Sequence, residues 1–286
     1  MRQLIINADD FGLHPTINAG IIEGHQKGVI TSTSLIAAGI SFDDAVSQAL
    51  QNPDLGIGVH LALVGGLPPI APADKVASLL TKEGLLYPHY PSFIAAWLKG
   101  KIALTDIVYE WNAQITKILD AGITVSHFDS HQHLHVLPGL NQLMIHLSEQ
   151  FSIFKIRIPK EPLTFFATGP FAASRIIART GLTTCAQLAE SKWKTKLTNT
   201  DHFYGTLAGG NLTKTRWKNI IQELPLGTSE VMTHPGLNSS ELGRSFPWNY
   251  HWEEELEALK SEELRTWIHE KNIRLINYHH LPNRKD

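Results

Sequence analysis

Two adjacent carboxylates, Asp9 and Asp10, follow a short run of β-forming residues near the start of the chain. Residues 4–6 (Leu-Ile-Ile) predict a buried strand, and Gly12 and Pro15 predict a turn before the next helix. Two acids at the carboxyl end of a buried strand repel each other unless a cation or a shared proton offsets the charge. Because successive strand residues point to opposite faces, both can reach one site only where the strand is already breaking up. A helix N-cap next to a turn residue is the alternative interpretation of this pair.

Other residues that could do chemistry follow later predicted strands. His60 ends the predicted strand 55–61, and several polar residues come at or after the strands 124–129, 154–159 and 229–233, namely Asp129, His131, His133, His135, Arg157 and His234. The carboxyl ends of parallel strands open on one face of an α/β fold, where active sites are built. We therefore expect these side chains to converge.

One carboxylate and two imidazoles would form a metal site with open positions for water and substrate. A divalent ion there lowers the pKa of bound water, and the second Asp is then free to accept a proton. At most two of the alternating histidines 131, 133 and 135 can share one face of an extended segment. We therefore expect His133 to support a ligand from outside the metal site or to be turned away from it. Asp129 is expected to orient a histidine in the same way.

Two further residues have candidate catalytic roles. Arg157 is a candidate to keep the general base ionised, with a surface ion pair as the alternative. His234 precedes Pro235-Gly236 and is a candidate acid that protonates a leaving amine, with a loop-capping histidine as the alternative.

The elements that position these residues alternate between strands and helices. Strands are predicted at 4–6, 31–37, 55–61, 124–129, 154–159, 229–233 and 273–278, and helices at 17–27, 41–51, 105–121, 140–150, 213–224 and 252–271. This rhythm predicts an α/β fold with about seven parallel strands, a TIM-like (β/α) barrel that is distorted or incomplete. The 286 residues suit one such domain spanning 1–286, with insertions near 64–104 and 160–210.

Composition excludes several classes of function. Lys and Arg total 25 against 27 Asp and Glu, so no basic surface suggests a nucleic acid or an anionic membrane. No apolar run approaches the ~20 residues of a membrane span. The single cysteine, Cys185, excludes an intramolecular disulfide and a zinc site built from cysteines. The first residues lack the apolar core of a signal peptide, which predicts a cytoplasmic protein.

Four motifs in register resemble the YdjC-like carbohydrate deacetylases of the ChbG type. They are Asn-Ala-Asp-Asp-Phe-Gly at 7–12, Gly-Val-His-Leu at 58–61, Asp-Ser-His-Gln-His-Leu-His at 129–135 and Thr-His-Pro-Gly at 233–236. The resemblance implies a distorted barrel, one divalent ion held by Asp10, His60 and His131, and hydrolysis of the N-acetyl group of a sugar. A more distant resemblance to NodB-type polysaccharide deacetylases implies Asp9 as general base, Arg157 as the residue that tunes it and His234 as general acid.

The substrate and the metal stay open from sequence. Segments 65–72 and 161–210 are similar to the hopanoid-associated HpnK-like branch, so the acetylated sugar is that of an oligosaccharide or of a glycolipid. Family resemblance implies Mg²⁺, whereas two imidazoles suit Zn²⁺ better. Aromatic residues are candidates to stack on sugar rings, namely Tyr87, Tyr90, Phe246, Trp248 and Tyr250. Exposed aromatic residues near the carboxyl terminus are compatible with a homodimer.

Three rival functions use the same residue types. Two histidines and one carboxylate also describe non-haem iron(II) oxygenases, although those sites generally sit on β folds. A metal-dependent phosphoesterase would hold two bridged metal ions and more carboxylates. A catalytically silent sugar-binding barrel would keep the same side chains around the strand ends, but would gain little from a base beside a metal ligand.

Overall fold

A parallel sheet forms the centre of the computed structural model, which describes residues 1–165 and 171–282. Within these residues the strands are β1 (Arg2–Phe11), β2 (Ser32–Leu35), β3 (Gly56–Leu61), β4 (Val125–Ser130), β5 (His202–Tyr204), β6 (Gly227–Thr233) and β7 (Ile273–Leu275). The hydrogen-bonded order is β4-β3-β2-β1-β6-β5, with β7 paired to β1, and each of these pairings is parallel. The predicted α/β class with a distorted parallel barrel is confirmed.

Strand β1 has partners along both edges. Strand β6 pairs with it from Arg2 to Ala8. Strand β7 pairs with Arg2–Leu4, and β2 pairs with Asn7, Ala8 and Phe11. Because a strand has only two edges, β7 and β2 divide the edge opposite β6 between them. The strand that carries Asp9 and Asp10 therefore lies at the centre of the sheet.

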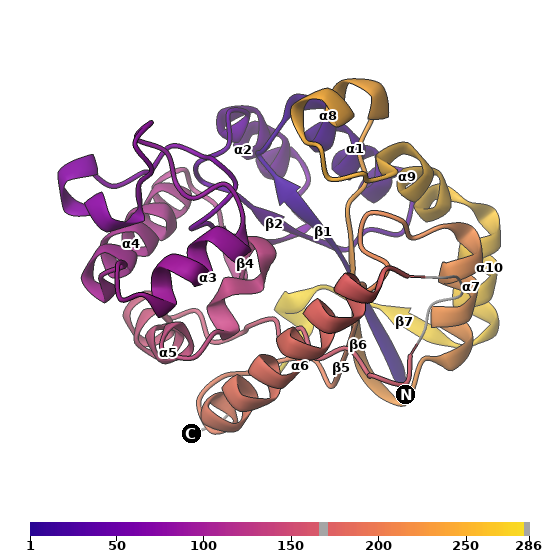
Figure 1. Ribbon diagram of the computed structural model, residues 1–286. Helices are drawn as coiled ribbons and strands as arrows, with labels where there is room; N and C mark the ends of the chain where they lie inside the picture. The colour runs from indigo at the N-terminus through magenta and orange to yellow at the C-terminus, as the bar shows by residue number, and fades with distance from the viewer. Residues whose placement is uncertain (166–170, 283–286) are drawn as a thin grey trace.

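Helices surround the sheet, with α3–α5 gathered on one side and α7, α9 and α10 on the other (Figure 1). The helices are α1 (Pro15–Gln26), α2 (Phe42–Gln51), α3 (Tyr90–Leu98), α4 (Leu104–Asp120), α5 (Leu140–Phe151), α6 (Ala173–Trp193), α7 (Lys214–Glu223), α8 (Ser239–Ser245), α9 (Trp252–Lys260) and α10 (Glu262–Glu270). Short 3₁₀ turns are η1 (Ala73–Lys75), η2 (Ala77–Leu79), η3 (His131–Val136) and η4 (Tyr278–His280). Across residues 1–165 and 171–282, no helix has both the length and the apolar character that crossing a membrane requires.

The two faces of β1 differ in polarity. Alternate residues of β1 join the main core with residues of α1, namely Leu4, Ile6, Ala8, Ile17 and Ile21. The intervening residues Ile5, Asn7 and Asp9 face the space that the curled sheet encloses, where Asn7 Nδ2 donates to Ser34 Oγ at 2.8 Å. The interior of the barrel is therefore polar beneath the ends of the strands.

The prediction of a full strand at 154–159 is wrong. This segment makes isolated bridges, from Ile156 to Phe128 of β4 and from Lys155 to Thr198. Pro159 has no N–H to donate, so a ladder could not continue through it. The segment still closes the gap between β4 and the residues that lead into β5. Strand β5 itself lies inside the predicted 160–210 insertion, whose residues 166–170 are outside the described part of the chain.

Two predictions near the carboxyl end also need correction. The single helix predicted over 252–271 is two helices, because Ser261 has an extended ψ of 140° and its side chain accepts from Leu264 N–H as the N-cap of α10. The strand predicted over 273–278 ends at Leu275, and Tyr278 begins the turn η4. The predicted insertion near 64–104 contains η1, η2 and α3.

Candidate active site

The end of β1 turns both acids toward the same space. Asp10 has φ of +70°, and the pairing of β1 with β2 shifts register between Ala8 and Phe11. Such a left-handed residue breaks the alternation of side chains along the strand. Asn18 fixes the turn that follows, because its Oδ1 accepts from Gly12 N–H at 2.7 Å. The strand is thus already breaking up at Asp10, as simultaneous access of both acids requires.

Asp10, His60 and His131 form a buried cluster that could hold a metal ion. One donor atom from each lies within 4.8 Å of the others. Asp10 Oδ1 is 3.0 Å from His131 Nδ1 and 3.6 Å from His60 Nε2. The side chains come from the ends of β1 and β3 and from η3, which directly follows β4. The structure therefore brings together the three residues that the family resemblance names as ligands.

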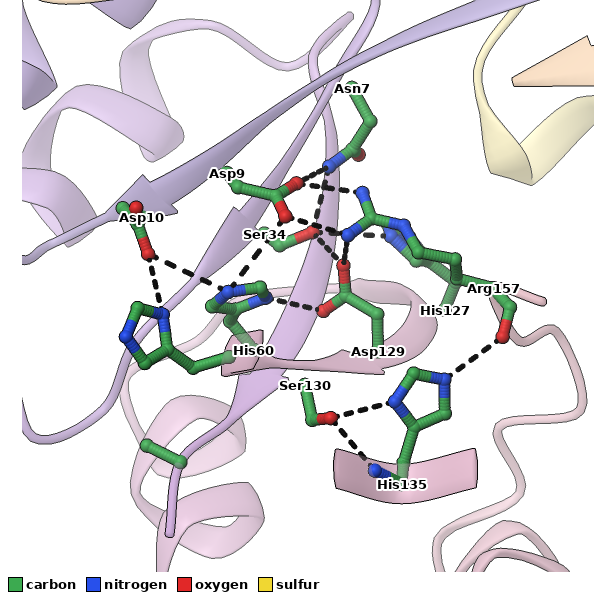
Figure 2. A network of polar contacts seen from close by, with 12 residues as sticks. Asn7, Asp9, Asp10, Ser34, His60, His127, Asp129, Ser130, His135 and Arg157 are labelled. Atoms are coloured by element: carbon green, nitrogen blue, oxygen red, sulfur yellow. Dashed lines mark hydrogen bonds and ion pairs between the residues drawn. The ribbon is translucent and has the colours of Figure 1, made fainter. Parts of the chain in front are cut away.

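Asp129 orients His60. Its Oδ1 accepts from His60 Nδ1–H at 2.7 Å, which leaves His60 Nε2 facing Asp10 and Asp9. The register of the sheet makes this contact possible, because His60 of β3 pairs with Asp129 of β4. Asp129 Oδ2 accepts from Ser34 Oγ–H at 2.7 Å. Figure 2 shows His60 between the carboxylates of Asp10 and Asp129.

Arg157 makes a bidentate ion pair with Asp9. Its Nη1 and Nη2 each lie 2.7 Å from an oxygen of Asp9, and both side chains are buried. Asn7 Nδ2 donates to Asp9 Oδ1 at 2.9 Å. These three donors fix the plane of the Asp9 carboxylate, and its Oδ2 lies 3.9 Å from His60 Nε2 (Figure 2). Arg157 makes a buried pair here, in place of the surface ion pair that the sequence left open.

Two residues that the sequence did not single out hold the other end of Arg157. Glu230 Oε1 accepts from Arg157 Nε–H at 2.8 Å, and Tyr278 donates its hydroxyl to Glu230 Oε2. Glu230 and Tyr278 are both fully buried. Burial raises the pKa of Glu230 to about 7 even though Arg157 and Tyr278 stabilise its ionised form. Arg157 therefore contacts three carboxylates, since its Nη1 also lies 2.7 Å from Asp129 Oδ2.

Charges in the cluster shift the pKa values of two candidate ligands. Burial alone would raise the pKa of Asp10, but His131, His60 and His234 hold it well below its ordinary value. Burial alone would lower the pKa of His60, but Asp129, Asp9 and Asp10 raise it to about 9. The raised pKa of His60 reflects the three carboxylates around it, which favour a positive charge at this position.

His234 directly follows β6, which pairs with the edge of β1 opposite β2. Its backbone N–H donates to Glu255 Oε2 at 2.6 Å, and the same oxygen accepts from Thr233 Oγ1. Within the described residues, His234 Nδ1 is buried without a hydrogen-bond partner. The imidazole lies 4.8 Å from the ring of Tyr250. Glu255 of α9 thus fixes the backbone at His234, a contact that the sequence did not reveal.

His133 and His135 lie outside the ligand cluster. Gln132 and His133 both have left-handed backbones, with φ of 54° and 57°, and the ring of His133 packs edge-on against Phe203 at 6.0 Å. The Nδ1 atom of His135 pairs with Ser130 Oγ at 2.6 Å, and its Nε2–H donates to the Arg157 carbonyl at 3.0 Å. His135 therefore supports the backbone of Arg157.

Aromatic residues of the loop before α9 lie beside the cluster. The ring of Trp248 is 5.7 Å from that of His131, and Phe246 and Tyr250 pack against Trp248 at 4.8 and 5.5 Å. Tyr87 instead packs against Phe93. Of the five residues predicted to stack on sugar rings, Phe246, Trp248 and Tyr250 form one continuous surface next to the candidate ligands.

Comparisons with known proteins cover nearly the whole chain. Residues 3–270 match the family model described as YdjC-like protein. Carbohydrate deacetylases of Brevibacillus brevis and Clostridium beijerinckii are 28% and 30% identical to the chain, over 98% and 96% of its length and 99% and 98% of theirs. A crystal structure from Enterococcus faecalis, named there as a candidate cellobiose-phosphate cleavage protein, superposes with a TM-score of 0.74 at 25% identity and covers 97% of both chains.

Proposed function

The chain belongs to the YdjC-like protein family, and from that premise we propose that it is a carbohydrate deacetylase that hydrolyses the N-acetyl group of a sugar to an amine and acetate. One observation carries the proposal. The end of β1 presents Asp10 to two histidines and, one position earlier in the chain, presents Asp9 to the same space. A base beside a candidate metal cluster is the arrangement that metal-assisted hydrolysis of an amide uses.

The residues present fit a divalent cation. Asp10, His60 and His131 supply one oxygen and two nitrogen donors in buried surroundings. Among the described residues this cluster contains one guanidinium, that of Arg157, and four buried carboxylates, namely Asp9, Asp129 and Glu230, which contact Arg157, and Asp10, which faces His60 and His131. A bound cation would offset this excess of negative charge. An ion held there would lower the pKa of a water and polarise the acetamide carbonyl.

Asp9 is the proposed general base, and its contacts favour one of its two oxygens as the proton acceptor. Oδ1 accepts from both Arg157 Nη2 and Asn7 Nδ2, whereas Oδ2 accepts, among the residues that the structure describes, from Arg157 Nη1 alone and lies 3.9 Å from His60 Nε2. Oδ2 therefore keeps a lone pair directed toward the ligand cluster. We assign the proton of the attacking water to this oxygen.

His234 is the proposed general acid. Its backbone is fixed by Glu255, and its ring lies close enough to Asp10 to lower the pKa of that carboxyl. Because Nδ1 is buried, Nε2 is the nitrogen that we propose donates to the departing amine. The surface formed by Phe246, Trp248 and Tyr250 would hold the sugar ring against the site.

Arg157 argues against a two-metal phosphoesterase. Asp9, His60 and Asp129 form a second group of possible ligands. The Arg157 Nη1 atom, however, lies 2.7 Å from both Asp9 Oδ2 and Asp129 Oδ2. The guanidinium thus takes the place of a second cation, and we expect one bound metal ion per chain. Two ions per chain would favour the phosphoesterase.

Acetate release tests the proposal. The metal-free protein is reloaded separately with Mg²⁺, Zn²⁺, Mn²⁺ or Co²⁺ and given N-acetylated oligosaccharides and N-acetylated glycolipids. We expect acetate that depends on added metal, and the panel then identifies both metal and substrate class. Sugar binding without acetate release from any substrate would instead support the catalytically silent barrel.

A further inference from the structure

The guanidinium of Arg157 contacts three carboxylates. Two of its nitrogens bind Asp9, one of these also contacts Asp129, and its Nε donates to Glu230. The side chain is fully buried, and its guanidinium lies 5.7 Å from the ring of Phe203. A guanidinium is planar, so fixing Nε as well as both Nη atoms leaves it one orientation.

Glu230 has a second buried partner, Tyr278, in addition to Arg157. Its second oxygen accepts the Tyr278 hydroxyl, and the ring of Tyr278 stacks on that of His127 at 3.7 Å and 10°. All three residues are fully buried. The chain of contacts therefore runs from His127 through Tyr278 and Glu230 to Arg157, and ends at Asp9 on the proposed site.

Stability alone does not account for a carboxylate at position 230. The cluster already has more carboxylates than its guanidinium can neutralise, and a buried charge carries a desolvation penalty that an apolar residue of similar volume avoids. Burial raises the pKa of Glu230 to about 7, which is the physical expression of that penalty. What the carboxylate supplies is a directed acceptor for Arg157 Nε–H, with 2.8 Å between the heavy atoms.

We propose that Glu230, held by Tyr278, is a positioning residue that orients Arg157 so that both of its Nη atoms face Asp9. This role rests on the proposed function, because it matters for catalysis only if Asp9 is the base. Without the Nε contact the guanidinium can turn about its Cδ–Nε bond toward Asp129, and Asp9 loses its bidentate partner. Asp9 Oδ2 then no longer points at the attacking water, while sugar binding is unaffected.

Matched substitutions at two buried glutamates test the role. Glu230→Met removes the acceptor, and Glu230→Gln keeps an oxygen for Arg157 Nε–H. Glu110 of α4 is the control, because it is equally buried but accepts from the backbone N–H groups of Ile70 and Ala71. We expect Glu230→Met to lower kcat by about tenfold to a hundredfold, the effect of a misplaced catalytic group. KM and bound metal should stay within about twofold of the wild type, since ground-state binding is not altered.

The controls separate positioning from a loss of stability. Glu230→Gln should recover most of kcat, and Glu110→Met should lower the unfolding temperature with kcat unchanged. Tyr278→Phe keeps Glu230 as the acceptor for Arg157 Nε–H but removes the hydroxyl that donates to Glu230 Oε2. It should therefore reduce kcat to a smaller extent than Glu230→Met. If Glu230→Met does not fold, Glu230→Gln and Tyr278→Phe carry the test. Equal kcat in the wild type and in the variants that fold would overturn the proposal.

Nuclear magnetic resonance can test the contact between Glu230 and Arg157 without any substrate. In protein labelled with ¹⁵N at arginine, the Arg157 Nε–H signal should exchange slowly with water, remain in Glu230→Gln and be lost in Glu230→Met. A slow signal that persists in Glu230→Met would overturn the anchoring by Glu230. A wild type that shows the anchored signal yet releases no acetate would overturn the proposed function and the catalytic role together. An active wild type with an unaffected Glu230→Met overturns the role alone.

Discussion

Arg157 binds both oxygens of Asp9 with equal N–O distances of 2.7 Å, so the carboxylate that stands next to the candidate metal cluster is held in a single plane. Asp10, its neighbour in the chain, makes no such pair and instead faces His131 at 3.0 Å. Adjacent carboxylates are thereby given separate partners, a guanidinium for one and imidazoles for the other. This division supports the proposed roles of Asp9 as proton acceptor and Asp10 as metal ligand.

Asp9→Asn should separate these two functions. The amide keeps the size of the side chain but cannot take up a proton, and a general base typically contributes about 10²- to 10⁴-fold to the rate. We expect bound metal to equal that of the wild type, because Asp10, His60 and His131 are unchanged, and acetate release to fall by a factor in that range. Metal content by mass spectrometry and initial rates check both expectations. Wild-type turnover in this variant would remove Asp9 as the base.

Substitution of a candidate ligand should lower metal affinity more than substitution of Asp129, which orients His60. His131→Ala removes one of three donors, so we expect almost no bound metal and no activity. Asp129→Asn leaves all three ligands but weakens the contact with His60 Nδ1–H, which should lower affinity by roughly 10- to 100-fold. Titration of the metal-free variants by calorimetry gives the order. A His131→Ala variant with wild-type affinity would contradict the ligand set.

Stability of the metal-free protein should decrease as pH rises past neutrality. Burial opposes the charge on His60, but Asp129, Asp9 and Asp10 raise its pKa from 6.5 to about 9. The folded protein therefore keeps a proton that the unfolded chain has lost, so this contribution is complete below about pH 6.5 and disappears as pH rises through about 9. The raised pKa of Glu230 acts in the same direction up to about pH 7. Urea unfolding between about pH 7 and 9 measures the slope, because the lowered pKa values of His127, His133 and His135 act in the opposite direction at and below their ordinary value of 6.5.

His60→Gln supplies the control for this pH dependence. Without the imidazole, the free energy of unfolding should change less than in the wild type between about pH 7 and 9, the range between the ordinary pKa of His60 and its raised value. Saturating metal should reverse the sign in the wild type, because a ligating imidazole must be neutral and binding strengthens as protons leave. An unchanged slope in His60→Gln would show that another group is responsible.

Gly58→Ala should destabilise the protein through its effect on the barrel interior. A Cβ at this position would overlap the imidazole of His127, which pairs with Gly58 across β3 and β4. Overpacking of this kind costs about 1–3 kcal/mol. Gly181→Ala in α6 is the control, because a Cβ there meets no atom within 4 Å. Thermal unfolding of the two variants should show a loss only for Gly58→Ala.

The strand ends could be predicted from sequence because they follow a local pattern. Short β-forming runs followed by polar residues place Asp10, His60 and His131 at the same edge of the sheet, and the structure brings them together. The sequence predicted only that the strand must break up if both acids are to reach one site. The residue types of Asp9 and Asp10 do not by themselves predict the φ of +70° at Asp10.

The polar interior of the barrel could not be predicted in the same way. Glu230 lies in the middle of β6, where a carboxylate is as compatible with a solvated face as with a buried one, and its partners come from distant segments. Arg157 lies 73 positions away in the chain. The alternation of Ile5, Asn7 and Asp9 was the available signal, because a polar residue two positions before Asp9 must share its face.

The division of β1 between partners has a consequence for biosynthesis. Strand β1 is translated before the other strands of the sheet, and β2 follows soon after it. The residues of β6 and β7 that pair with Arg2 are Gly227 and Ile273, which are translated much later. Contacts that span nearly the whole chain close late, because their loop entropy must be met before any pairing compensates for it. A nascent chain on the ribosome therefore carries Asp9 and Asp10 on a strand with one edge largely open. The candidate site gains His234, which directly follows β6, only after most of the chain has emerged.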